Sequence, residues 1–168
     1  DQAFTTAHKG YRISNSNCAT CHDPHASSIP KLLRPNQHSP FKGGKCTVCH
    51  ESSGGDSFAI KGTTTELCTR CHRAILEFEQ KPFHHHLTLE NSCTNCHNPH
   101  ASATTDLLIS SQEVLCMSCH FNDTGEKEKA AYITHHGMDC SNCHTPHGSD
   151  NERYLLSLDL DLCVGCHE

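Results

Sequence analysis

The stretch CATCHDPHASSIPKLL, residues 18–33, holds two cysteines at positions i and i+3, a histidine directly after the second cysteine, and a Pro-His pair two residues later. Close variants return as CTNCHNPHASATTDLL at residues 93–108 and CSNCHTPHGSDNERYLL at residues 140–156. A sequence motif that recurs along the chain indicates internal duplication and an array of small units. The fold is therefore expected to be built around this motif.

Every cysteine of the chain belongs to the pattern C-x-x-C-H, and seven such motifs use all 14 cysteines. The cysteine pairs are Cys18 and Cys21, Cys46 and Cys49, Cys68 and Cys71, Cys93 and Cys96, Cys116 and Cys119, Cys140 and Cys143, and Cys163 and Cys166. We call the motifs that begin at Cys18, Cys46, Cys93 and Cys140 first-type, and those at Cys68, Cys116 and Cys163, which have Leu before the first cysteine, second-type.

From Cys46 onward, motifs of the same type recur at intervals of 47 or 48 residues, as from Cys46 to Cys93 and on to Cys140. This spacing predicts one domain, residues 1–168, that begins with an orphan segment and continues as tandem two-motif units. The orphan segment covers residues 1–37, and the units cover about 38–83, 84–131 and 132–168.

The composition supplies little material for an ordinary apolar core. Only 35% of the 168 residues are hydrophobic and 5% aromatic, whereas His reaches 17 residues. No apolar run approaches the roughly 18 residues of a membrane span. The net charge of −6, with 13 dispersed basic residues, makes nucleic acid an unsuitable partner. The chain opens at Asp1 without a basic and apolar leader, which we interpret as a mature chain whose signal peptide has been removed.

In C-x-x-C-H, one helical turn presents both thiols and the imidazole on a single face. Two thiols can add across the vinyl groups of one haem, and the adjacent histidine is then held as an axial ligand of its iron. Four-cysteine zinc sites, disulfides and thioredoxin-like redox motifs also use C-x-x-C, but none of them requires the histidine after each motif. The predicted proximal ligands are His22, His50, His72, His97, His120, His144 and His167.

The segments CHDPHASSIPKLL, CHNPHASATTDLL and CHTPHGSDNERYLL resemble the multihaem c-type cytochromes built from paired CxxCH and CxxCHxPH units. The resemblance runs from about residue 8 to residue 168. It implies seven covalently attached haem c groups and electron transfer outside the cytoplasm. The expected fold is mostly irregular with short α-helices, a core made of haem and little or no β-strand. The chain without haem is expected to be largely unfolded.

Ten histidines remain outside the motifs, and seven of them are predicted to be distal ligands of the seven irons. They are His8, His25, His38, His84, His85, His86, His100, His135, His136 and His147. One scheme lets the histidines upstream of a motif cap first-type haems and the Pro-His residues cap second-type haems. The scheme has a flaw at CHESSGG, where Ser53 replaces the Pro-His histidine, so that His25 would have to serve the haem at Cys68. A Met138 ligand is a further alternative, and Met117 is expected to pack.

Three functions follow from these sites. The first is a periplasmic or extracellular electron carrier or wire, whose partners are redox proteins or external electron acceptors. The second is a subunit that stacks with copies of itself into an extracellular filament. The third is a multihaem reductase with one open iron, which the surplus of histidines disfavours, so no catalytic residues are assigned and no enzyme is expected.

Overall fold

The structure is a computed structural model, and it describes residues 2–11, 13, 16–51, 59–85, 93–120, 139–158 and 160–164. The chain divides into two compact units. Unit 1 comprises Asp1–Cys68 and Thr94–Ile109, and unit 2 comprises Thr69–Cys93 and Ser110–Glu168. The predicted site residues that lie outside the described part are His86, His135, His136, Met138, Cys166 and His167.

The helices are short. They are α1 (Gln2–Ala7), α2 (Ser39–Lys42), α3 (Thr64–Thr69), α4 (Ile75–Phe78), α5 (Cys93–Cys96), α6 (Gln112–His120) and α8 (Leu160–Val164). Single 3-10 turns cover Cys18–Thr20, Pro30–Leu32, Cys46–Val48, Thr105–Leu107, Cys140–Asn142 and Glu152–Tyr154. In the described part of the chain, no helix has the length and apolar character that a membrane crossing requires.

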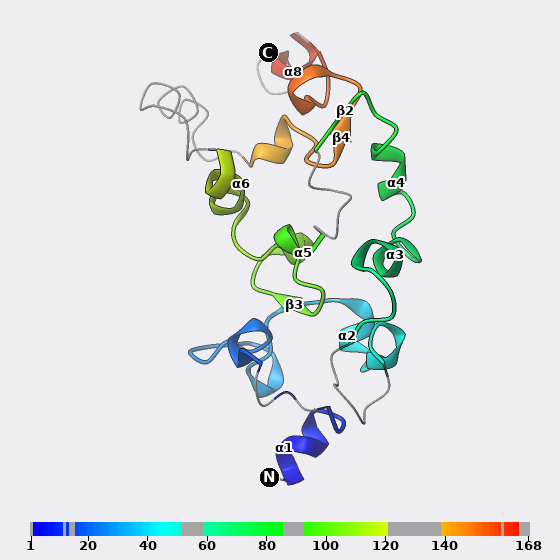
Figure 1. The fold of residues 1–168 in the computed structure, drawn as a ribbon. Coiled ribbons are helices and arrows are strands. Elements are labelled where there is room, and N and C mark those ends of the chain that lie inside the picture. Colours follow the sequence, from blue (N-terminus) through cyan, green and yellow to red (C-terminus); the bar gives the residue numbers. More distant parts are fainter. Residues whose placement is uncertain are drawn as a thin grey trace. The chain divides into compact units, whose positions relative to one another are not determined.

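Among the described residues, four two-residue strands form two antiparallel pairs. In unit 1, β1 (Asn36–Gln37) pairs with β3 (Ala101–Ser102). In unit 2, β2 (Phe83–His84) pairs with β4 (Gly148–Ser149), and the two arrows lie side by side in Figure 1. The expected fold class is confirmed, because the chain is mostly irregular with short helices and very little strand.

Few side chains of the described residues are buried. The buried apolar residues are Tyr11 and Ala101, the buried polar residues are Ser102 and Ser149, and no large side chain is fully enclosed. Ten large apolar side chains are exposed, among them Phe4, Leu32 and Ile109. The described polypeptide therefore forms no apolar core of its own, as expected for a chain that wraps cofactors.

Three first-type motifs continue into loops of the same backbone structure. We call residues 18–34, 93–109 and 140–156 the first, second and third attachment loops. In the first, Asp23 N donates to Leu32 O (2.7 Å) and Arg34 N donates to Cys21 O (2.9 Å). The corresponding pairs are Asn98 N to Leu107 O (2.6 Å) and Ile109 N to Cys96 O (2.9 Å) in the second loop, and Thr145 N to Tyr154 O (2.7 Å) and Leu156 N to Cys143 O (2.9 Å) in the third. Each loop is thus closed on itself by its backbone.

Candidate functional site

The first-type motifs are single helical turns. At Cys18, the carbonyl oxygen accepts from the backbone N–H groups of Cys21 (3.2 Å) and His22 (2.9 Å). The carbonyls of Cys46 and Cys140 accept from the equivalent cysteine and histidine at the same distances. The Asn17 side chain caps the first of these turns by accepting from Ala19 N. The backbone therefore carries two thiols and an imidazole within one turn, as the spacing predicts.

The first cysteine of each second-type motif lies on an α-helix, and the first-type motif at Cys93 lies on the four-residue helix α5. Cys68 belongs to α3, Cys116 and Cys119 to α6, and Cys163 to α8. A capping box starts α3, because Thr63 N donates to Glu66 Oε2 (3.0 Å) and Glu66 N donates to Thr63 Oγ1 (3.2 Å).

All thirteen cysteines in the described part of the chain are free thiols, and none forms a disulfide. Burial raises the pKa of the Cys21 thiol, an effect that Arg34 opposes and Cys18 reinforces. Both sulfurs of a motif are therefore available for thioether bonds, which is the chemistry that haem c requires of its site.

The imidazoles of the attachment loops are held by one recurrent hydrogen bond. Their Nδ1 atoms lie against a carbonyl oxygen nine residues further along the chain. These contacts join His22 to Lys31 O (2.8 Å), His97 to Asp106 O (2.7 Å) and His144 to Arg153 O (2.8 Å). Because a carbonyl oxygen only accepts, Nδ1 carries the proton and Nε2 keeps its lone pair. The loop thus presents each imidazole as an Nε2 metal ligand.

Each accepting carbonyl depends on two consecutive residues in the left-handed backbone region. The pairs are Lys31 and Leu32, Asp106 and Leu107, and Arg153 and Tyr154, with φ between 53° and 64°. None of these residues is glycine, so the conformation carries strain that the closed loop must hold. The sequence analysis missed these acceptors. The signal available was a Leu-Leu pair near the end of each loop, although in the third loop it lies one residue further from its motif.

The residue between the motif and the Pro-His pair forms a small turn. In the first loop, Asp23 Oδ1 accepts from His25 N (3.0 Å) and Ala26 N (3.3 Å). These two N–H groups hold the pKa of Asp23 below its usual value. In the second loop, Asn98 Oδ1 accepts from His100 N and Ala101 N at the same two distances. Asp or Asn at this position therefore fixes the backbone of the second histidine.

The two strand pairs bring predicted distal histidines together. Beyond β1 and β3, His38 N donates to His100 O (2.9 Å), and His38 Nδ1 donates to Pro99 O (3.0 Å). Beyond β2 and β4, His85 N donates to His147 O (3.3 Å). His38 and His85 are 47 residues apart, as are His100 and His147, so both units repeat one arrangement.

Three ring contacts within the units join a motif histidine to a histidine outside the motifs. The centroid distances are 6.2 Å for His8 and His22, 5.8 Å for His50 and His100, and 6.1 Å for His85 and His120. The first pair agrees with a scheme in which upstream histidines serve first-type motifs. The other two differ from it, because His100 follows a Pro and lies beside a first-type histidine, and His85 is upstream and lies beside a second-type histidine.

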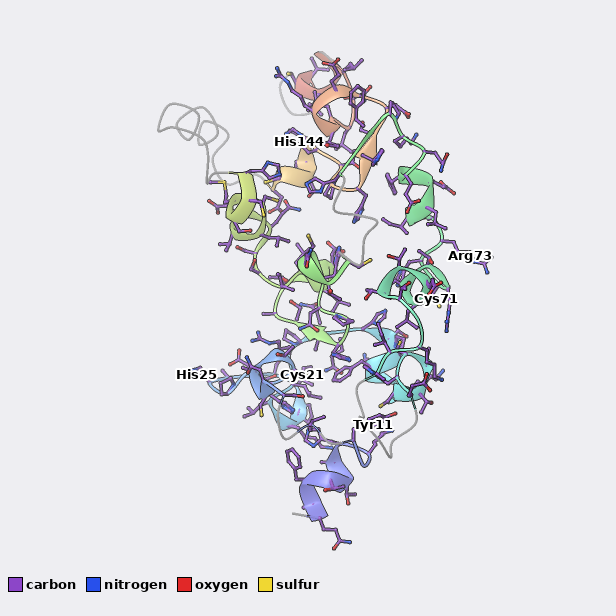
Figure 2. The ribbon with its side chains drawn as sticks, viewed as in Figure 1. Tyr11, Cys21, His25, Cys71, Arg73 and His144 are labelled. Carbon is purple, nitrogen blue, oxygen red and sulfur yellow. The ribbon has the colours of Figure 1, made fainter. Side chains whose placement is uncertain are left out.

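The remaining candidates are placed differently. His25 is exposed at the outer edge of its loop (Figure 2). His84 Nδ1 donates to Lys81 O (3.1 Å), and its own carbonyl accepts from the Tyr154 hydroxyl (3.4 Å). Within the described residues, neither His25 nor His84 has the ring of another histidine beside it.

Aromatic rings flank several of these imidazoles. Phe41 lies 5.5 Å from His100 and Phe78 lies 5.7 Å from His147, between ring centroids. Burial, followed by the nearby His50 and His38, lowers the pKa of His100, so its ring is held in the neutral form that binds metals. The sequence analysis gave these phenylalanines no role.

The donor set as a whole fits haem c. It offers paired free thiols, an imidazole with its Nε2 lone pair available, and further imidazoles nearby. Comparison with known proteins gives the same chemistry. Residues 12–37, 38–76, 85–125 and 135–168 match the family model described as the doubled CXXCH motif.

One curated relative is the multiheme cytochrome MtrA of Shewanella baltica (strain OS185). It is 32% identical to this chain over 116 residues, which are 67% of this chain and 34% of the relative. The chain thus spans about a third of the length of that protein.

Proposed function

Because the chain belongs to the doubled-CXXCH-motif family of multihaem c-type cytochromes, we propose that it carries electrons through seven covalently bound haems. Its 14 cysteines form seven complete motifs, which gives the count. Haem supplies one-electron oxidation and reduction at iron without a bond to substrate being made or broken. The protein's part is to hold, orient and shield these groups.

The observation that carries the proposal is the fixed orientation of the motif histidines. In all three attachment loops, Nδ1 is bound to a backbone carbonyl, so Nε2 is the nitrogen left to bind a metal. A ligand that is already oriented needs little movement when the iron changes oxidation state. Such small reorganisation suits rapid electron transfer better than catalysis.

A second histidine at each iron would close the coordination sphere. Ten non-motif histidines are available for seven irons, and three already lie beside a motif histidine within the units. With both axial positions taken, no vacancy is left for oxygen, nitrite or another substrate. We therefore propose that the protein is not an enzyme. Its partners would be redox proteins or external electron acceptors.

The cysteine chemistry also favours a location outside the cytoplasm. Haem c is joined to thiols in the periplasm or outside the cell, so the family points to a periplasmic or extracellular location. The relative named multiheme cytochrome supports the same general function.

The test combines three measurements on the purified holoprotein. Pyridine haemochrome assay should give seven haems per chain, and stepwise reductive titration should take up seven electrons reversibly. Carbon monoxide should leave the spectrum of the reduced protein unchanged. A carbon monoxide complex, or turnover with nitrite or hydroxylamine, would instead show an open iron and identify a reductase.

A further inference from the structure

We propose that His100 completes the site of His50 in the preceding repeat, and that His85 completes the site of His120 in its own repeat. We call this assignment the histidine exchange. Each repeat would then finish its second-type site by itself and the first-type site of the repeat before it. This assignment rests on the proposed haem-binding function, and it names the ligands of two of its sites.

The ring distances carry the first step. With a metal–nitrogen bond of about 2 Å on each side, two imidazoles that share one metal lie about 6 Å apart between ring centres. His50 and His100 are 5.8 Å apart with ring planes inclined by 19°, and His85 and His120 are 6.1 Å apart. Each pair therefore has the separation of two axial ligands of one iron.

The backbone explains how distant residues reach these positions. The register of β1 and β3 sets Gln37 opposite Ala101, and the hydrogen bond from His38 N to His100 O extends that pairing by one residue. His100 is thereby fixed in unit 1, where His50 also lies.

Unit 2 repeats this device. There β2 and β4 set His84 opposite Gly148, and His85 N donates to His147 O. We call each strand pair, together with the backbone hydrogen bond that extends it, a clasp. Because the same bond occurs in both units, at positions 47 residues apart, the clasp is a feature of the repeat.

The exchange also accounts for an irregularity in the sequence. If Pro-His residues serve the preceding repeat, the residue at position 53 would serve the motif at Cys18. It is Ser53, which has no imidazole, but His8 lies 6.2 Å from His22 and takes that place. Both Nδ1 atoms of this pair are bound to carbonyls, those of Phe4 (2.9 Å) and Lys31 (2.8 Å), so each ring keeps Nε2 for a metal. Seven irons need seven of the ten candidates, so the exchange can leave His25 out.

Simple aromatic packing is the competing explanation, since paired rings also lie about 4.5–7 Å apart. Packing would not select its partners by role. Each of the three pairs instead joins one motif histidine to one non-motif histidine, and all three distances fall between 5.8 and 6.2 Å.

The first experiment replaces one ligand in the full-length holoprotein. We expect His100→Ala to convert one low-spin haem per chain to high-spin in the electron paramagnetic resonance spectrum, and to let the reduced protein bind one carbon monoxide. The matched control is Thr105→Ala, which changes an exposed side chain of the same attachment loop and should leave all haems low-spin. An unchanged spectrum of His100→Ala, or the same change in Thr105→Ala, would overturn the assignment.

A second experiment identifies which haem His100 serves. The variant Cys46→Ala/Cys49→Ala lacks one haem but keeps His50 and His100. Adding His100→Ala to that variant should create no further high-spin haem, because the site it completes is already gone. A new high-spin haem in the triple variant would show that His100 serves a different iron, such as a second-type one.

Should the cysteine variant fail to mature, His100→Gly with added imidazole gives the answer by another route. Imidazole should return the high-spin haem to low-spin, and a variant that is low-spin without imidazole would contradict the ligand role. The unmodified protein separates the two proposals. If it binds carbon monoxide, the proposed function fails. If it does not, and His100→Ala stays low-spin, only the exchange fails.

Discussion

The first and second attachment loops share one internal structure but differ in what lies against them. Both close with the same backbone bonds, both hold their motif histidine through Nδ1, and both fix the Pro-His backbone with an Asp or Asn side chain. In the second loop, residues 101–102 pair with β1, and Ala101 is 0% exposed. In the first loop, the equivalent residues 26–27 form no strand, and Ala26 is exposed.

This difference separates two kinds of information in the sequence. The loop itself is specified by about 17 residues, since it forms in the same way with and without a strand partner. The use of its Pro-His residue depends on a second repeat, which must supply the partner strand. Substitutions that affect both loops, or only one of them, test this difference.

Preventing haem attachment should have the largest effect, and it should abolish both loops alike. The described polypeptide has no apolar core, so we expect the chain without haem to be largely unfolded. Far-ultraviolet circular dichroism and hydrogen exchange of protein made without the attachment machinery would measure this. Slow exchange at the amides of Asp23 or Asn98 in that protein would mean that the loops fold without their cofactor.

Enlarging the residue after the Pro-His pair should affect only the second loop. Ala101→Leu inserts three carbons into a fully buried position beside β1, and overpacking of this kind costs about 1–3 kcal/mol. Ala26→Leu makes the same change at an exposed position and should stay within about 0.5 kcal/mol of the parent. Denaturant unfolding of the two holoproteins gives both values. Equal losses would show that the first loop is also covered.

Glycine in the left-handed turn should affect both loops equally. Lys31 (φ 64°) and Asp106 (φ 53°) are exposed, so their side chains contribute little packing. Left-handed backbone costs an ordinary residue about 1–2 kcal/mol, and glycine gives back about 0.5–1 kcal/mol in entropy. We expect Lys31→Gly and Asp106→Gly each to raise the free energy of unfolding by up to about 1 kcal/mol. Stabilisation in one loop alone would contradict the shared backbone.

The smallest effect should be a pH dependence confined to the first loop. The N–H groups of His25 and Ala26 lower the pKa of Asp23 in the folded protein. Its carboxylate therefore stabilises the fold above the unfolded pKa of about 3.9, and this contribution disappears as the pH falls through the lower folded value.

Asp23→Asn copies the second loop, where Asn98 makes the same two bonds. The variant should lack that low-pH loss of stability. Thermal unfolding of the parent and of Asp23→Asn at pH 6 and pH 3 would measure this effect. The difference between their two thermal midpoints should shrink on acidification. A difference that stays constant with pH would exclude the carboxylate as its source.

The sequence was sufficient to predict the local backbone structure. The helical turn at each motif follows from the i, i+3 and i+4 spacing, and the short helices and sparse strands follow from the composition. The loop closure was within reach, because the Leu-Leu ending recurs with the motif. Its geometry was not, since Lys, Asp and Arg at positive φ break the usual preference for glycine.

The pairing of histidines was beyond sequence reasoning for a different reason. His50 and His100 are brought together by strands of two residues, which are too short to show any alternation of polar and apolar side chains. Position in the chain therefore favoured nearby partners. His85 differs from His84 only in register, which becomes visible once β2 is seen to pair with β4.

The clasp between β1 and β3 also fixes the order in which parts of the chain can be completed. A chain that reaches its compartment amino end first delivers Asn36–Gln37 early, and their partners Ala101–Ser102 follow only after more than one further repeat has emerged. The first attachment loop can close at once, whereas the proposed site of His50 and His100 would have to wait for the next repeat. Maturation would thus advance down the chain with one unfinished site at its front, and any pause in export would leave that site open to foreign ligands.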